Sequence, residues 1–292
     1  MVLRSQGLQD TLENIGTFFC SFGMNKTVCR GAIHTMISVI LPELTTFLLS
    51  PSYFCGRITG SCTNKWKAID PNEFIDRQLD SKPSFVQNND YIDRLYDEIN
   101  TTNKRETIRV LHFSDIHLDF QYETGANTKC DQPTCCRAIN GKPARWEDGA
   151  GAWGNYRCDL PKETAELMFM YIKNMHPDEK PEMILWTGDS TPHDIWNQSI
   201  HKNILYTVEI SKFLQENLPE VPVIAVPGNH EFYPVNVMEF DDDNDVVLNR
   251  IGDEWHDWLT PEAAESFKTK GYYVMPLEHP KIKNVKIIGL NT

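Results

Sequence analysis

The sequence predicts an α/β fold that is preceded by a small all-helical block, and three observations support this prediction. Over residues 7–50, apolar residues recur at three- and four-residue steps, as they do on one face of a helix. Residues 67–106 are polar and rich in Pro, Asn and Asp, which is typical of a linker. After them, short β-rich runs alternate with helical segments, which is the pattern of a sheet buried between helices.

The expected elements follow in order along the chain. One short helix is expected inside the linker, at 91–99. Beyond the linker, the β-rich runs are 108–113, 183–186, 221–226 and 285–290, and amphipathic helices are expected at 162–175 and 204–218. The predicted domains are therefore 1–66 (helical), 67–106 (linker) and 107–292 (α/β).

The charge balance excludes one class of partner. The 292 residues include 28 Lys and Arg against 41 Asp and Glu, which gives a formal net charge of −13. A surface this acidic repels phosphate backbones, so we expect no nucleic-acid partner. A site that handles phosphate would need a local cation, and a metal ion is the obvious candidate. We also expect no membrane-spanning helix, because His34, Pro42 and Glu43 interrupt the most apolar run.

The cysteines indicate an oxidising compartment. All eight fall in two clusters before residue 159: Cys20, Cys29, Cys55 and Cys62, then Cys130, Cys135, Cys136 and Cys158. No C-x-x-C pair is present, so disulfides are favoured over a thiolate zinc site. Glycosylation sequons at Asn25, Asn100 and Asn197 agree with a secreted or lumenal protein. The first ten residues lack the apolar core of a signal peptide, so we expect the chain to begin inside a longer gene product.

Polar clusters follow three of the expected strands. Asp115 and His117 come after the first, Asp189 after the second, and Asn229 with His230 after the third. In sheets of this kind the carboxyl ends of the strands carry the ligand site, so these side chains should meet. Their oxygen and imidazole donors suit zinc, manganese or iron, and one carboxylate can bridge two ions. Each cluster alone would be interpreted as an ordinary turn, but three in succession favour a metal site.

The motifs D-I-H, G-D-S-T-P-H and G-N-H-E resemble those of the calcineurin-like metallophosphoesterase family, which implies an incomplete metallophosphoesterase β-sandwich with flanking helices. Within that family the longer segments VLHFSDIHLDFQY, KCDQPTCCR and VPGNHEFYPVN resemble the acid sphingomyelinase group. The cysteine-rich insert (residues 130–158) is the more specific marker. The first cysteine cluster looks like the last four of the six cysteines of a saposin-type domain, so residues 1–66 would be a partial domain of that type.

The resemblance implies a role for each motif residue. Two zinc ions would be held, the first by Asp115, His117 and Asp189, and the second by Asp189, as the bridge, and Asn229. His230 would face the reacting phosphate, and His193 would give a proton to the leaving alkoxide. A structural alternative for His193 is a helix cap beside Asp194.

The resemblance also implies the disulfide pairing. Together with the clustering, it predicts the bonds Cys20–Cys29, Cys130–Cys135 and Cys136–Cys158, and it leaves Cys55 and Cys62 without their family partners. The alternative for the first cluster is a helical hairpin with free or mutually paired thiols and no lipid role.

The implied activity is that of a parent enzyme, secreted or lysosomal, which hydrolyses sphingomyelin to ceramide and phosphocholine and touches the membrane through its saposin-type block. The chain stops before the G-H-x-H segment and the further histidine of the family, so we expect residues 1–292 alone to be inactive. One alternative is a nucleotide phosphodiesterase of the sphingomyelinase-like group. Another is a non-catalytic lipid-binding fragment.

Overall fold

The computed structural model describes residues 6–42, 70–80, 89–101, 107–238 and 245–291. The chain forms two compact units, one made of Met1–Pro42 with Ile108–Thr292 and the other of Glu43–Thr107. Cys55 and Cys62 lie outside the described residues. The domain boundaries drawn from the sequence stay a prediction.

The first unit begins with two helices, as the periodicity predicts. They are α1 (Gln6–Cys20) and α2 (Lys26–Thr35), and α2 continues into a π-helical turn at Met36–Ile40. The predicted disulfide Cys20–Cys29 joins them. The remainder of the expected helical stretch, beyond residue 42, lies outside the described residues. The N-terminal region is therefore a disulfide-linked helical pair.

The second unit contains α5 (Pro71–Asp80) and α6 (Asn89–Thr101). The helix expected at 91–99 is confirmed as α6, whereas α5 was not predicted. Asp70 accepts a hydrogen bond from the N–H of Asn72 (2.9 Å), and Pro71 is the first helical residue. Both features favour a helix start, but the Pro and Asp content of this segment had indicated a linker.

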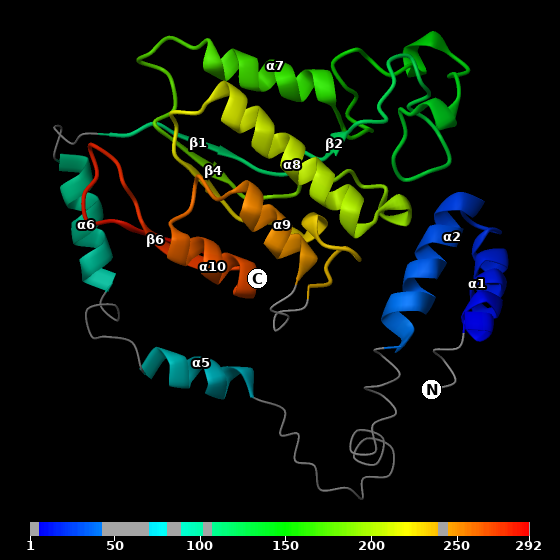
Figure 1. Cartoon of the computed structure of the whole chain (residues 1–292), viewed down its shortest axis with the longest axis horizontal. Coiled ribbons are helices and arrows are strands. Elements are labelled where there is room, and N and C mark those ends of the chain that lie inside the picture. Colours follow the sequence, from blue (N-terminus) through cyan, green and yellow to red (C-terminus); the bar gives the residue numbers. More distant parts are fainter. Residues whose placement is uncertain (1–5, 43–69, 81–88, 102–106, 239–244, 292) are drawn as a thin grey trace, which may run out of the picture. The chain divides into compact units, whose positions relative to one another are not determined.

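A parallel three-stranded sheet forms the centre of the first unit. Its strands are β1 (Val110–Phe113), β4 (Met183–Trp186) and β5 (Val223–Ala225), in the order β1-β4-β5. The helices α7 (Lys162–Lys173) and α8 (Ile200–Asn217) pack against each other beside it (Figure 1). The predicted α/β class is thereby confirmed.

Smaller elements complete this unit. A short parallel pair, β2 (Leu118–Asp119) and β3 (Leu160–Pro161), lies at the start of α7. Two further helices and an antiparallel strand pair follow along the chain: α9 (Val246–Glu254), α10 (Pro261–Lys270), β6 (Tyr273–Pro276) and β7 (Lys286–Gly289). The run expected at 285–290 is β7.

Aromatic side chains fill the core between the sheet and the helices. Trp186 on β4 and Phe169 on α7 are fully buried. Phe113 on β1 packs between them, with ring centroids 5.9 Å from each, and Trp255 reaches Trp186 at 5.4 Å after α9. Burial of each such side chain stabilises the fold by about 1.5–3 kcal/mol. The strands, and the loops that leave them, are thus held on a rigid base.

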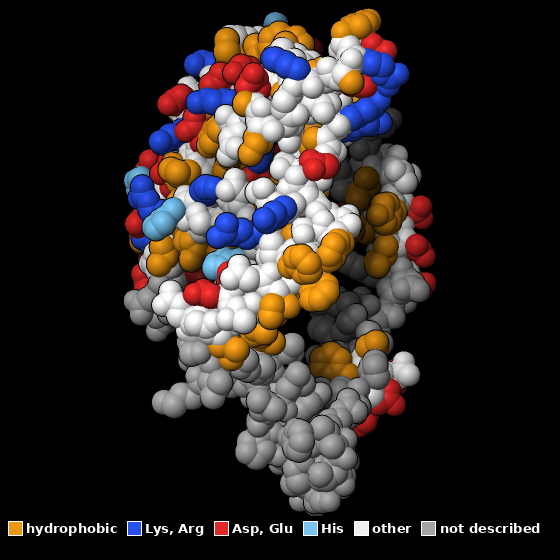
Figure 2. Space-filling view, turned by 90° about the vertical axis from the view of Figure 1, so that its right-hand side faces the viewer, with side chains coloured by type: hydrophobic (Ala, Val, Ile, Leu, Met, Phe, Trp, Pro, Cys, Tyr) orange, Lys and Arg blue, Asp and Glu red, His pale blue; other side chains and the backbone are white. Residues whose placement is uncertain are grey.

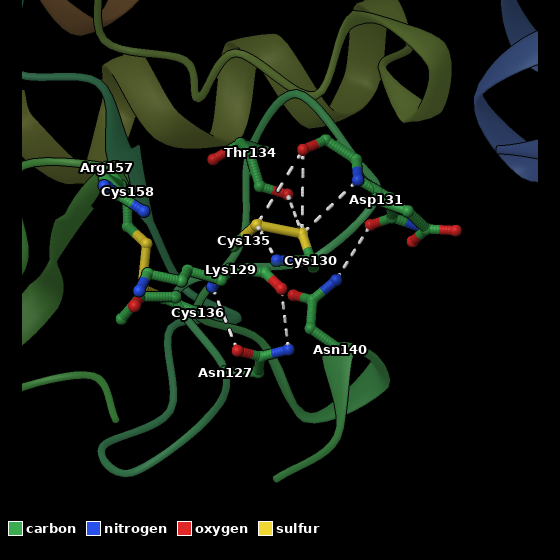
Figure 3. The surroundings of a disulfide bond; sticks show 12 residues. Asn127, Lys129, Cys130, Asp131, Thr134, Cys135, Cys136, Asn140, Arg157 and Cys158 are labelled. Atoms are coloured by element: carbon green, nitrogen blue, oxygen red, sulfur yellow. Dashed lines mark hydrogen bonds between the residues drawn. A yellow bond between two sulfur atoms is a disulfide. The ribbon is translucent and has the colours of Figure 1, made fainter. Parts of the chain in front are cut away.

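The cysteine-rich insert has little regular structure and depends on its disulfides. The predicted bonds Cys130–Cys135 and Cys136–Cys158 are both present (Figure 3). Its helical content is limited to the short 3₁₀ turns Ala138–Asn140 and Trp146–Asp148. A segment with so few apolar side chains to bury is typically stabilised by such crosslinks.

The loops that follow β1 and β4 extend the parallel pairing beyond the strands. The N–H of Asp115 donates to Gly188 O (3.1 Å), and the N–H of His117 donates to Asp189 O (3.0 Å). Gly188 has a φ of +82°, and a Cβ added there would lie 2.0 Å from the N of Gly228. Only glycine lets the loop after β4 approach the loop after β5 so closely.

Gly188→Ala tests this close approach against a matched control. Gly125 has nearly the same φ, +81°, but a Cβ there would meet nothing within 4 Å. We expect Gly125→Ala to lower the free energy of unfolding by about 1–2 kcal/mol, the cost of a left-handed non-glycine residue. Gly188→Ala should cost about 1–3 kcal/mol more through overpacking. Urea unfolding measures both, and equal losses would show that the approach is loose.

Candidate metal centre

All six motif residues singled out in the sequence lie at the carboxyl edge of the sheet. The donor atoms of five of them, all except Asn229, form two groups, within each of which every pair of donor atoms lies no more than 4.8 Å apart. The first group is Asp115, His117 and Asp189, and the second is His117, His193 and His230. His117 belongs to both groups. The strands therefore bring together side chains that are more than one hundred residues apart in the sequence.

The backbone is strained at the first group. Asp115, His117 and Asp189 have φ values of 55°, 41° and 60°, in the left-handed region that non-glycine residues avoid. Each such residue costs about 1–3 kcal/mol, and strain of this kind clusters at functional sites. The hydrogen bonds between the two loops keep these three residues in the strained conformation.

His117 presents one ring nitrogen to the site. Its Nδ1 lies 2.6 Å from Thr191 O, and because a carbonyl only accepts, Nδ1 must carry the proton. In the neutral form of this ring, Nε2, which lies 3.8 Å from Asp115 Oδ1, carries the lone pair. A histidine whose other N–H is held by a backbone carbonyl is the usual arrangement for a metal ligand.

Two polar groups bear on whether these donors fit a cation. Asn229 Oδ1 lies 3.3 Å from both carboxylate oxygens of Asp189, while its Nδ2 donates to Asn236 Oδ1 at 2.8 Å. Acceptors that face each other in this way repel unless a cation lies between them. His230 Nδ1 is also buried without a hydrogen-bond partner. With the Asn229 amide rotated, its Nδ2 donates to both Asp189 oxygens at 3.3 Å and satisfies them without an ion, whereas a shared first-row metal ion would satisfy the donors in the other orientation.

Glu231 joins two of the loops, a role that the sequence did not reveal. Its side chain is fully buried, and its carboxylate accepts the N–H groups of Gly228 (2.6 Å), Asp189 (3.0 Å) and Ser190 (2.7 Å). Three such donors stabilise a buried carboxylate. The last letter of G-N-H-E was the available signal, but its side chain points into the protein.

His193 is paired with Asp159, which sequence reasoning also missed. Its Nδ1 donates to Asp159 Oδ1 (2.7 Å), and its backbone N–H donates to Asp159 Oδ2 (2.9 Å). The next helical turn begins after Asp194, so the His193 side chain does not act as a cap. No motif marked Asp159, because it directly follows the insert, after Cys158, and is far from His193 in the sequence.

The surroundings shift the pKa values of the two predicted catalytic histidines in opposite directions. The hydrogen bond to Asp159 raises the pKa of His193, despite partial burial and with help from nearby carboxylates. Burial alone would raise the pKa of Asp159, but its bonds to His193 outweigh this and lower it. Burial, and then repulsion from His117 when that ring is protonated, lower the pKa of His230. His193 therefore tends to hold a proton, whereas His230 tends to be neutral.

A cavity of about 660 Å³ opens beside these residues. Its walls include Asp115, His117 and His193, and Trp153 and Tyr156 of the insert form part of its rim. Cavities of this size accept small organic ligands. The site is therefore open to a substrate on the side of the insert.

Comparisons with known proteins agree with this geometry. A family model described as calcineurin-like phosphoesterase matches residues 108–290. Sphingomyelin phosphodiesterase B of Dictyostelium discoideum is 36% identical over 298 residues, which is 100% of this chain and 43% of that protein. Sphingomyelin phosphodiesterase A of the same organism is 29% identical over 91% of this chain and 45% of its own length.

A third relative matches a shorter part of the chain. Acid sphingomyelinase-like phosphodiesterase 3b of Mus musculus is 33% identical over 63% of this chain and 38% of that protein. The chain thus spans less than half the length of these relatives. Because the family model covers more than half of its residues, the chain belongs to the calcineurin-like phosphoesterase family and is related to the sphingomyelin phosphodiesterases.

Proposed function

We propose that this protein takes part in the hydrolysis of a lipid phosphodiester, namely sphingomyelin, to ceramide and phosphocholine. The observation that carries the proposal is the position of Asp189, whose carboxylate lies between the Asp115–His117 pair and Asn229. A carboxylate in this place can bridge two metal ions. The names of the relatives give the substrate class.

The residues would divide the work as follows. Asp115, His117 and Asp189 would hold one zinc ion, and Asp189 with Asn229 would contribute to the other. When bound, the ions would supply Lewis acidity to the phosphoryl group. His230 would lie against the phosphate oxygens.

His193 would serve the leaving group. An alkoxide is a poor leaving group, so it needs a proton as its bond to phosphorus breaks. The imidazole has one ring nitrogen bound to Asp159 and more than half of its side chain exposed (53%). His193 is therefore placed to donate that proton at the open side of the site.

The extent of the alignments favours a lipid substrate over the nucleotide alternative. The relative named sphingomyelin phosphodiesterase B aligns with the whole chain, including the N-terminal helical region. Phosphodiesterase 3b aligns with only 63% of the chain. The strained, unsatisfied donors disfavour a purely non-catalytic lipid-binding role, because such a role requires no metal site.

The N-terminal helical pair supports contact with a membrane surface. Phe18, Phe19 and Phe22 of α1 and the following turn are 60%, 66% and 75% exposed, and their rings touch one another. Figure 2 faces the side on which α1 and α2 lie in Figure 1, and it shows hydrophobic side chains exposed among charged ones. In the described part of the chain, no helix is long and apolar enough to cross a bilayer. We therefore propose interfacial contact by a saposin-type block, in a secreted or lysosomal protein whose disulfides suit an oxidising compartment.

Zinc titration of residues 1–292 tests the metal centre directly. Loss of an outer-shell partner lowers metal affinity about 10- to 100-fold. Because Asp189 would bind the zinc directly, we expect Asp189→Asn to weaken zinc binding by more than this. Asp178→Asn is the control, because its side chain is 90% exposed and forms no part of the site. Isothermal titration calorimetry gives both affinities. Equal zinc affinities for the two variants would contradict the assignment of Asp189.

Hydrolysis assays test the reaction. The protein expressed from its complete gene should release phosphocholine from sphingomyelin when zinc is present, and chelation by EDTA should stop this. Asp189→Ala should remove activity, since the proposed bridge is lost. Faster turnover of a nucleotide phosphodiester than of sphingomyelin would instead support the nucleotide alternative.

Vesicle binding tests the exposed phenylalanines. Replacing Phe18, Phe19 and Phe22 by Ser should weaken binding to sphingomyelin–phosphatidylcholine vesicles at least about tenfold, because each buried ring contributes apolar transfer energy. Ile139→Ser is the control, since Ile139 is 73% exposed but lies on the insert. Co-sedimentation measures both, and an equal loss in the control would show that the contact is not specific to α1.

A further inference from the structure

We propose that Asp159 is a positioning residue for His193, and that Thr134 and Arg137 of the adjoining cysteine-rich insert help to hold the segment that carries this histidine. The inference rests on the proposed function, in which His193 protonates the leaving group.

The contact between Asp159 and His193 fixes both partners. One carboxylate oxygen accepts from the ring Nδ1 (2.7 Å) and the other from the backbone N–H of the same residue (2.9 Å). The hydroxyl of Thr134, a residue of the insert, donates a hydrogen bond to Asp159 Oδ2 at 3.1 Å. The Asp159 side chain is only 7% exposed, so the carboxylate has little freedom to turn. The His193 ring is held at one end, which leaves Nε2 for the substrate.

The partners of Asp159 indicate what the buried carboxylate is for. Burying a carboxylate is costly unless donors satisfy it. Two of the three donors that reach Asp159 belong to His193, whose own side chain is 53% exposed. A carboxylate that served stability alone would gain more from a buried structural partner. The pairing therefore favours the orientation of His193 over the packing of the core.

A second contact anchors the next residue. Arg137 of the insert donates to Asp194 Oδ2 (2.5 Å) and to Asp119 Oδ2 on β2 (2.7 Å). All three side chains are at most 5% exposed. The insert and the residue that follows it therefore hold two consecutive residues: Asp159 binds His193, and Arg137 binds Asp194.

The disulfide joins these two anchors. Arg137 directly follows Cys136, Asp159 directly follows Cys158, and these cysteines are bonded to each other. The disulfide thus links the two residues, Arg137 and Asp159, that hold the His193–Asp194 segment.

These contacts would orient His193 for proton transfer to the leaving group. As the oxygen of water bonds to phosphorus, the bond between phosphorus and the leaving oxygen breaks, and that oxygen takes the proton of His193 Nε2. The imidazole is left neutral with its Nδ1–H still bound to Asp159, and the attacking water gives up a proton to solvent. Loss of Asp159 should free the ring to turn and should slow this proton transfer in particular.

The test compares two substrates in the protein expressed from its complete gene. The leaving group of sphingomyelin is an alkoxide, which needs the proton. The leaving group of bis(p-nitrophenyl) phosphate is a stable phenolate, which does not. For Asp159→Asn we expect kcat on sphingomyelin to fall about 100-fold with KM little changed, and kcat on the phenolate substrate to fall about threefold or less. Zinc content should be unchanged. Asp148→Asn, a carboxylate of the same insert that pairs with Lys129 and Arg145, is the control and should keep full activity on both.

The variant His193→Gln separates the possible failures. If it lacks the selective loss on sphingomyelin, the proposed role of His193 is wrong. If it shows that loss and Asp159→Asn does not, or if Asp159→Asn slows both substrates equally, the positioning role is overturned. Should Asp159→Asn fail to fold, Thr134→Val removes only the hydroxyl that fixes the carboxylate. We expect Thr134→Val to lower kcat on sphingomyelin by less than Asp159→Asn does, again with little effect on the phenolate substrate. If Thr134→Val shows no such selective loss, the proposal is also overturned.

Discussion

The candidate site depends on one buried charge. The Glu231 carboxylate accepts three backbone N–H groups from the two loops that follow β4 and β5. Without this acceptor, those N–H groups would be buried and unpaired, which costs about 1–3 kcal/mol each. The carboxylate thus holds Asp189 and Asn229 in neighbouring loops at a fixed separation. The glycines Gly188 and Gly228 make the same approach sterically possible.

This fixed geometry explains why strain and unsatisfied acceptors persist at the sheet edge. The loops hold Asp115, His117 and Asp189 in left-handed conformations, and His230 Nδ1 is buried there without a hydrogen-bond partner. Each feature raises the free energy of the folded chain. A bound cation would offset these costs, since it attracts the acceptors that otherwise repel. Metal binding and stability should therefore be linked in this protein.

The sequence predicts those parts of the site that depend on strand order, because residues after neighbouring parallel strands must share one edge. Asp115, Asp189 and Asn229 were identified for this reason. Asp159 and Arg137 could not be, since they come from an irregular insert whose path is set by disulfides rather than by periodicity. Similarly, α5 was missed because Pro71 and Asp70 are common both in linkers and at helix starts.

The charge of the chain and the walls of the cavity bear on the proposed substrate. The chain carries a formal charge of −13, and among the described residues that line the 660 Å³ cavity there is no Lys or Arg. Of two arginines of the insert, Arg137 is paired with Asp119 and Asp194, and Arg157 is exposed next to the lining residues Tyr156 and Cys158 without itself lining the cavity. A free phosphate dianion would enter such a cavity against the field of the protein. A phosphodiester has one negative charge, and the choline of a sphingomyelin head group balances that charge. A zwitterionic substrate therefore meets less repulsion here than an anionic nucleotide does, and only its phosphate needs the local cations that the metal centre and His193 would provide.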